Sequence, residues 1–294
     1  MPNNILNDTN KSGLNVYLQS DNATISRGDA NKIFNFQDFI SVPPDQNILV
    51  GLTNFEMANT LYNINPGFNT LTISSTSGSF PFIITSAHQI TLTPKNYNAT
   101  QLKDELNSKF SDATFLNSTG LSSLVVSFDE QTFKYTFTGN QNFRITECSF
   151  DREIGLENQL PTSSSSSYVC VDTILLGGIS SIYVGIKNLG INNLDSRGAV
   201  DNTIAKINVK SGLGGYIFYD EPENHYFVCN RREINSLEII LTDDRDRELV
   251  LNGGQFSLTL SFHYVYKRNQ KILHEYYLKR DDMIVENDKN SKEK

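Results

Sequence analysis

Two short acidic clusters carry the residue types that could bind a hard cation. The first contains Asp243, Asp244, Asp246 and Glu248, and the second contains Asp220, Glu221 and Glu223. Calcium takes about six to eight oxygen ligands, and neither cluster has the spacing and the glycine of a known calcium loop. Arg245 and Arg247 interleave the first cluster and can neutralise it, so a solvated turn between two apolar strands is the simpler interpretation. We predict no metal and no cofactor, and keep Asp243, Asp244 and Asp246 as the candidate ligands.

A second motif is a possible adhesion turn. Arg27, Gly28 and Asp29 form the tripeptide that is familiar from cell-adhesion ligands. The same three residues between two strands also serve simply as a turn, which would need only a positive φ at Gly28. Both interpretations stay open.

The chain has no recognisable catalytic set. The four histidines are scattered, at His88, His225, His263 and His274, and none belongs to a metalloprotease or nucleophile-elbow motif. Glu221 and Glu223 could act as the paired carboxylates of a glycosidase, but they are adjacent in one turn rather than placed across a groove. We therefore predict that the protein is not an enzyme.

Nucleotide and zinc sites find no support either. The G-x-G-G run at Gly212, Gly214 and Gly215 lies between two predicted strands with no following helix, which favours a flexible loop. The cysteines, Cys148, Cys170 and Cys229, are far apart and odd in number, which indicates neither a disulfide framework nor a zinc site. We expect a reducing compartment, in line with an amino terminus that lacks the pattern of a secretory signal.

The elements that must position these residues are mostly strands, because apolar and polar residues alternate along much of the chain. Strands are predicted from Leu14 to Leu18, Asn47 to Met57, Thr70 to Ser74, Phe80 to Thr85, His88 to Thr93, Ser122 to Phe128, Phe133 to Thr138, Ile179 to Lys187, Ile204 to Val209, Ile234 to Leu241 and Phe256 to Tyr266. Many short strands of this kind are typical of a sandwich or barrel.

One segment has a helical pattern instead. From Tyr97 to Phe110 the apolar residues recur four apart, and Asn98 with Gln101 forms a candidate capping box. A short helix is also predicted from Phe150 to Asn158, and the serine run Ser163 to Ser167 is expected to be too flexible and polar to join a core. We interpret 94–167 as a small α+β insertion domain between two parts of a jelly roll. The first part, 1–93, begins with a polar N-terminal arm, and the second part, 168–270, is followed by a charged extension at 271–294.

Length, charge and aromatic content limit the function classes. The 294 residues are enough for one large or two modest domains, and no apolar run approaches the length of a membrane span. The net charge of −8 opposes nucleic-acid binding in the absence of a basic cluster. Among 13 Tyr and 18 Phe, the stretch Tyr216 to Tyr219, the pair Tyr264 and Tyr266, and Tyr276 with Tyr277 are candidates for a subunit interface, unless they fill the core.

The chain contains three passages, Asn47 to Ile64, Leu92 to Phe110 and Ile234 to Phe262, that resemble parts of the penton (vertex) and minor capsid proteins of virophages and polinton-like viruses, in the double jelly-roll virus lineage. Asn47 to Ile64 is similar to their early strand and its Tyr-Asn turn, and Leu92 to Phe110 is similar to a helical segment that they carry. Ile234 to Phe262 resembles their closing hairpin, with an acidic turn, Leu-Asn-Gly and a final alternating strand. Together the passages cover about half of the chain.

The resemblance implies a mainly all-β protein, a single jelly-roll β-sandwich with an insertion domain, since a major capsid protein with two jelly rolls would need a longer chain. It also implies a structural protein of the virion, assembled in the host cytoplasm, that forms homopentamers at icosahedral vertices. The partners it implies are further copies of this chain and trimers of major capsid protein, with no specific nucleic acid and no membrane span.

Two other functions stay open beside the capsid role. A receptor- or glycan-binding β-sandwich head on a virion or phage-like particle would carry its site on the insertion loops, as β-sandwiches often serve as lectins. A β-sandwich glycosidase ranks last, for the reason given above. Assembly would discriminate the first two, because a ring of five that forms without ligand favours the penton and a monomer or trimer with sugar affinity favours the binding head.

Overall fold

A computed structural model describes residues 13–77, 83–157, 160–191, 193–194, 200–220 and 225–266. Several expectations fall outside these residues. They are the polar arm within 1–12, the carboxylates of Glu221 and Glu223, the aromatic pair Tyr276 and Tyr277, and the extension at 271–294.

The chain divides into two compact units. Unit 1 combines Met1–Thr60 with Ser181–Lys294, and unit 2 is the continuous segment Leu61–Ser180. The predicted insertion was 94–167, whereas unit 2 begins 33 residues earlier and includes the strands at 70–77 and 83–91. The reason is pairing: the strand at 70–77 joins the strand at 134–148, which lies well inside the predicted insertion.

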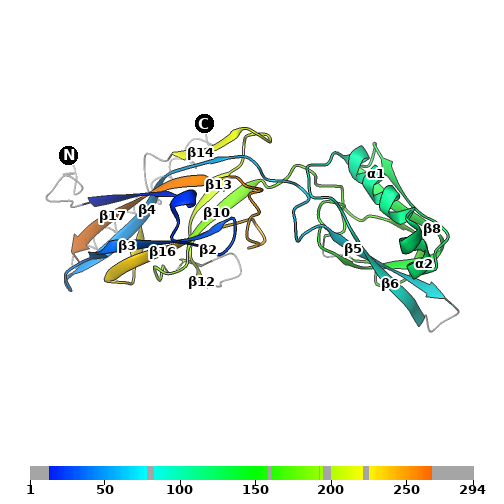
Figure 1. The fold of residues 1–294 in the computed structure, drawn as a ribbon, viewed down its shortest axis with the longest axis horizontal. Coiled ribbons are helices and arrows are strands. Elements are labelled where there is room, and N and C mark those ends of the chain that lie inside the picture. The colour runs from blue at the N-terminus through cyan, green and yellow to red at the C-terminus, as the bar shows by residue number, and fades with distance from the viewer. Residues whose placement is uncertain are drawn as a thin grey trace, which may run out of the picture. The chain divides into compact units, whose positions relative to one another are not determined.

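The first sheet of unit 1 has the order β1-β17-β4-β14, and β15 also pairs with β4. Figure 1 labels β17, β4 and β14 of this sheet. Its strands are β1 (Gly13–Gln19), β4 (Gln46–Ala58), β14 (Tyr216–Asp220), β15 (Phe227–Cys229) and β17 (Phe256–Tyr266). In β17 the alternation of the sequence becomes alternation of burial, because Phe256, Leu258 and Leu260 point into the core while the Ser and Thr between them do not.

The second sheet of unit 1 has the order β13-β10-β16-β3-β2 (Figure 1). Its strands are β2 (Ile25–Ser26), β3 (Asn31–Ser41), β10 (Ser181–Ile186), β13 (Thr203–Asn208) and β16 (Glu233–Thr242), and a separate pair is formed by β11 (Asn193–Leu194) with β12 (Val200–Asp201). Ile182, Val184, Leu237 and Ile239 from this sheet are fully buried. All pairings described in both sheets are antiparallel.

The strand order of unit 1 is that of a jelly roll. We number eight strands along the chain, with β2 counted with β3 and β15 counted with β14, and omit the small β11–β12 pair. One sheet then has the order first, eighth, third, sixth, and the other has the order fifth, fourth, seventh, second. This is the arrangement of two sheets and two Greek keys that defines a jelly roll. The predicted all-β jelly-roll sandwich is confirmed, and unit 2 is inserted between its third and fourth strands, β4 and β10.

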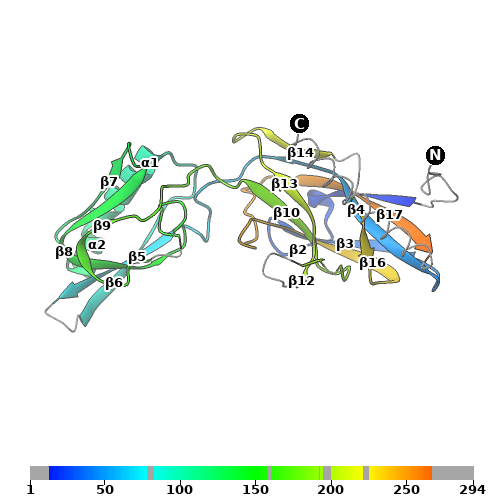
Figure 2. The same ribbon diagram turned by 180° about the vertical axis from the view of Figure 1, so that it is seen from behind.

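Unit 2 is an antiparallel sheet with two helices (Figure 2). The sheet order is β6-β5-β8-β7 and β9 also pairs with β8. Its elements are β5 (Thr70–Ser77), β6 (Ile83–Thr91), α1 (Ala99–Phe110), α2 (Ala113–Thr119), β7 (Leu124–Asp129), β8 (Lys134–Cys148) and β9 (Ser165–Val169). The predicted helix at Phe150 to Asn158 is instead a series of turns over the described residues 149–155.

Helix α1 begins where the sequence predicts. The Asn98 side chain accepts a hydrogen bond from the backbone amide of Gln101 at 2.8 Å, and the Gln101 side chain accepts one from the Asn98 amide at 3.1 Å. Leu102, Leu106 and Phe110 face the core of unit 2, where they pack with strand residues such as Leu71, Ile73, Val126, Phe137 and Ile145. This core is formed by unit 2 residues alone. No helix among the described residues is long and apolar enough to span a membrane.

Candidate interaction surfaces

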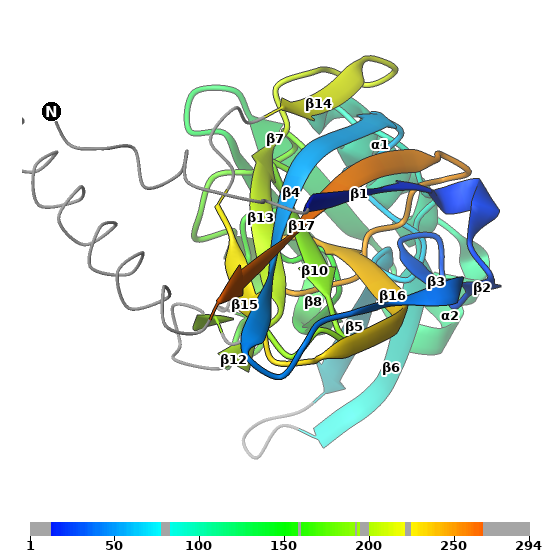
Figure 3. The same cartoon turned by 90° about the vertical axis from the view of Figure 1, so that its left-hand side faces the viewer.

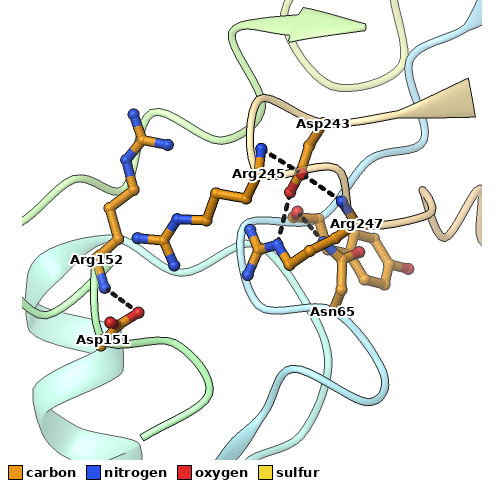
Figure 4. Close-up of polar contacts among 7 residues, drawn as sticks. Asn65, Asp151, Arg152, Asp243, Arg245 and Arg247 are labelled. Carbon is orange, nitrogen blue, oxygen red and sulfur yellow. Dashed lines mark hydrogen bonds and ion pairs between the residues drawn. The ribbon is translucent and has the colours of Figure 1, made fainter. Parts of the chain in front are cut away.

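The first acidic cluster forms a tight turn after β16, held by Asp243. The Asp243 carboxylate is buried and accepts hydrogen bonds from the backbone amides of Arg245 at 2.9 Å and Arg247 at 3.0 Å. It also pairs with Nε of Arg247 at 2.7 Å (Figure 4). Asp244 and Asp246 are exposed, and no group of three metal-ligating side chains gathers anywhere in the described part of the chain. The Asp243 side chain thus serves the backbone turn, with its charge balanced by Arg247.

The Arg-Gly-Asp motif forms the connection between β2 and β3. Arg27 pairs with Glu238 at 3.2 Å, and Asp29 is exposed. Gly28 is not among the described glycines with positive φ, so it lacks the conformation that the turn interpretation required. Because Gly28 has no side chain, the Glu248 carboxylate can lie close to the backbone there, at a place where a Cβ would overlap its Oε1.

The remaining candidates occupy structural positions. His88 lies edge-on to Phe115, and Nε2 of His263 lies 2.9 Å from the hydroxyl of Tyr226. The glycine run Gly212 to Gly215 precedes a strand, and the amide of Gly214 donates to the carbonyl of Asn59 at 2.8 Å. The amide of Asn59 also donates to the carbonyl of Gly215 at 2.7 Å, so backbone hydrogen bonds connect the loop to the residue that follows β4.

The three thiols are in environments that keep them protonated. Burial raises the pKa of Cys170 to about 12, and burial also raises the pKa values of Cys148 and Cys229 above the ordinary value for a thiol. A thiolate is the reactive form of cysteine, so none of the three has the depressed pKa of a nucleophile.

The three passages that resemble capsid proteins contact one another at two places. In unit 2, the Asn63 side chain donates to the carbonyl of Tyr97 at 2.8 Å and accepts from its amide at 2.9 Å, which joins the Tyr-Asn turn to the segment before α1. In unit 1, Asn252 donates to the carbonyl of Thr60 at 2.8 Å, and the Thr60 hydroxyl donates to the carbonyl of Leu251. The Leu-Asn-Gly sequence thus forms hydrogen bonds with the segment that directly follows β4.

Two features stand out on unit 1, and both involve aromatic residues. At one edge of the first sheet, β14 presents the aromatic pair, Tyr216 and Phe218, whose rings stack with centroids 5.7 Å apart. Their side chains are 59% and 62% exposed, while Ile217 between them is buried. Figure 3 shows β14 beside β4. Part of the predicted interface stretch Tyr216 to Tyr219 is therefore at the surface.

At the opposite edge of the first sheet lies β1, and an open pocket of about 430 Å³, which we call the edge pocket, is lined by β1 together with β3 of the second sheet. Tyr17, Leu18, Phe34 and Phe36 supply its apolar lining, and Asn22 and Thr24 are among its polar residues. The edge pocket was not predicted, because no strand was predicted between Asn31 and Ser41. The apolar residues of Lys32 to Ile40 were the signal that could have found β3.

No family model and no curated protein matches this chain. Among solved structures, the chain is similar to the crystal structure of the mavirus penton protein, with 12% sequence identity and a TM-score of 0.44. The alignment covers 87% of this chain and all of the mavirus chain. The fold described above rests on strand order and register alone.

Proposed function

We propose that this chain is a structural capsid protein, which forms the pentameric vertices of a small icosahedral DNA virus and contacts the surrounding major capsid protein. The observation that carries the proposal is the jelly-roll strand order of unit 1 with a separate unit inserted between β4 and β10. Jelly rolls are a recurrent architecture of viral capsid proteins, although lectins and other proteins share it.

Three further features support a structural role. The passages that resemble penton proteins contribute Asn63 and Asn252. The side chains of these two residues donate hydrogen bonds that connect distant segments, Asn63 within unit 2 and Asn252 within unit 1. The titratable candidates that the structure describes are engaged in turns and packing rather than arranged around a common cleft. The net negative charge fits a shell component better than a chain that packages nucleic acid.

In this role the protein belongs to the virion and assembles in the host cytoplasm. A ring of identical subunits repeats one head-to-tail contact until it closes, so each copy must present two different surfaces. The two aromatic features at opposite edges of unit 1 are compatible with that requirement.

The mass of the purified full-length protein in solution tests the proposal. A penton should have five times the 33.1 kDa mass of one chain, independent of any added ligand. Light scattering across a concentration series measures this directly. A chain that stays monomeric or trimeric and binds sugars on a glycan array would contradict the proposal and favour the receptor-binding head.

A further inference from the structure

The aromatic pair on β14 lies on a strand at the margin of its sheet. Among the described residues β14 pairs with β4 on one side and is the last strand of the order β1-β17-β4-β14. Proteins commonly protect such edges with charged residues or proline, because an exposed edge invites association. This edge instead presents Tyr216 and Phe218, each more than half exposed, and Leu213 just before the strand is 59% exposed.

The edge pocket has the complementary chemistry. Its apolar lining of Leu18, Phe34 and Phe36 suits an aromatic ring, and polar residues such as Asn22 and Thr24 suit a tyrosine hydroxyl. Its volume of about 430 Å³ leaves room for an aromatic side chain. Tyr17, which is 75% exposed, adds a further aromatic surface.

The aromatic pair lies on β14, at one edge of the first sheet, and the edge pocket lies beside β1, at the other edge of that sheet, so the two features cannot meet within one molecule. β17 and β4 separate β1 from β14, a distance of about 14 Å for three strand spacings of about 4.8 Å. A second copy of the chain, in contrast, carries both features in the positions that a head-to-tail contact requires. Such a contact uses two different surfaces and repeats until the rotation closes a ring.

We propose that the aromatic pair of one copy inserts into the edge pocket of the next copy and that this contact is the subunit interface of the ring. The inference rests on the proposed function and adds to it the surfaces by which the copies meet. Tyr216 and Phe218 are the inserting residues, and Tyr17, Phe34 and Phe36 are the receiving residues.

Two single variants, one on each surface, test the interface. Phe218→Asp places a charge on the inserting surface, and Tyr17→Asp places one at the pocket. Both side chains are largely exposed, so both variants should fold. Each variant alone should lose the ring and have the mass of one chain. An equimolar mixture should give a species of two copies and nothing larger. Phe218→Asp keeps an intact edge pocket and Tyr17→Asp keeps an intact aromatic pair, so one copy of each can form a single contact.

Controls separate loss of the interface from general damage. Val125→Asp changes a side chain that is 53% exposed on unit 2, outside both surfaces, and should keep the wild-type mass. Asn22→Trp is a second pocket variant that fills the cavity without adding charge, and it should behave as Tyr17→Asp does. Circular dichroism and thermal melting show whether each variant is folded.

The outcomes distinguish this inference from the proposed function. If the wild-type protein forms a ring of five and folded Phe218→Asp and Tyr17→Asp keep that mass, the ring uses other surfaces and only the inference is overturned. Dissociation of both variants without recovery of a two-copy species in the mixture also overturns it, since the two surfaces then do not bind one another. A wild-type protein that is monomeric at every concentration overturns the inference and the proposed function together.

Discussion

Asp243 combines burial, a negative charge and three hydrogen bonds in one turn. Replacing it with alanine leaves two backbone amides and Arg247 without their acceptor, and we expect a loss of stability on the order of 3 kcal/mol. Asp243→Asn should lose less, because the amide oxygen can still accept from the backbone. Urea unfolding measures both variants. If the cluster held calcium instead, wild-type stability would rise with added calcium and the variants would lose that increase.

Gly28 provides a second test at the scale of single residues. Its φ is not positive, and the atom that an added Cβ would meet is the end of the flexible Glu248 side chain, which can move. Gly28→Ala should therefore change the free energy of unfolding by less than about 0.5 kcal/mol.

Gly120 is the matched glycine, because it ends α2 with a φ of 69° and has open space around it. Gly120→Ala should cost about 1 kcal/mol from backbone strain alone. Thermal melting of the two variants compares them, and equal losses would mean that the Glu248 contact is rigid.

The capping box of α1 is the clearest feature that the sequence predicted at the scale of elements. Asn98→Ala removes the acceptor for the Gln101 amide at the start of a helix that buries three side chains, and should destabilise unit 2 by about 1 kcal/mol. Asn98→Asp keeps an acceptor and should stay near wild type. Urea midpoints compare the two, and a loss in Asn98→Asp as large as in Asn98→Ala would show that the amide group, rather than the cap, matters.

Alternation identified most strands because each of these has one buried face, as in β17. It failed where that condition does not hold. Ser165–Val169 forms β9 although its side chains are mostly exposed, because pairing with β8 needs only backbone groups. The serine run Ser163 to Ser167 was predicted to be too flexible and too polar to join a core, whereas its last three residues belong to a strand at the surface. Helix α2 has seven residues, too few for a helical period to be visible.

At the scale of the whole molecule, the location of the aromatic surfaces depends on contacts between distant parts of the sequence. Tyr216 and Phe218 were recognised from composition, but their exposure follows from the place of β14 at the end of its sheet. The edge pocket combines residues of β1 and of the segment after it with Phe34 to Phe36 of β3, which belongs to the other sheet, so it forms only where the two sheets come together. The adhesion motif and the acidic turn were visible in the sequence, whereas their contacts with Glu238, Glu248 and Arg247 were not.

The extent of unit 2 can be tested by expressing it alone. The segment 61–180 contains the whole sheet and both helices, and its core is built from its own residues, so it should fold and melt cooperatively. The segment 94–167, which the sequence analysis chose, lacks β5 and with it the fully buried Leu71 and Ile73. Since β5 pairs with β8 through 143–148, its removal exposes the core and leaves that half of β8 without this neighbour. We expect 94–167 to show no cooperative transition in circular dichroism or calorimetry. A cooperative transition for 94–167 at the temperature found for 61–180 would mean that β5 and β6 are dispensable and that the smaller boundaries define the domain.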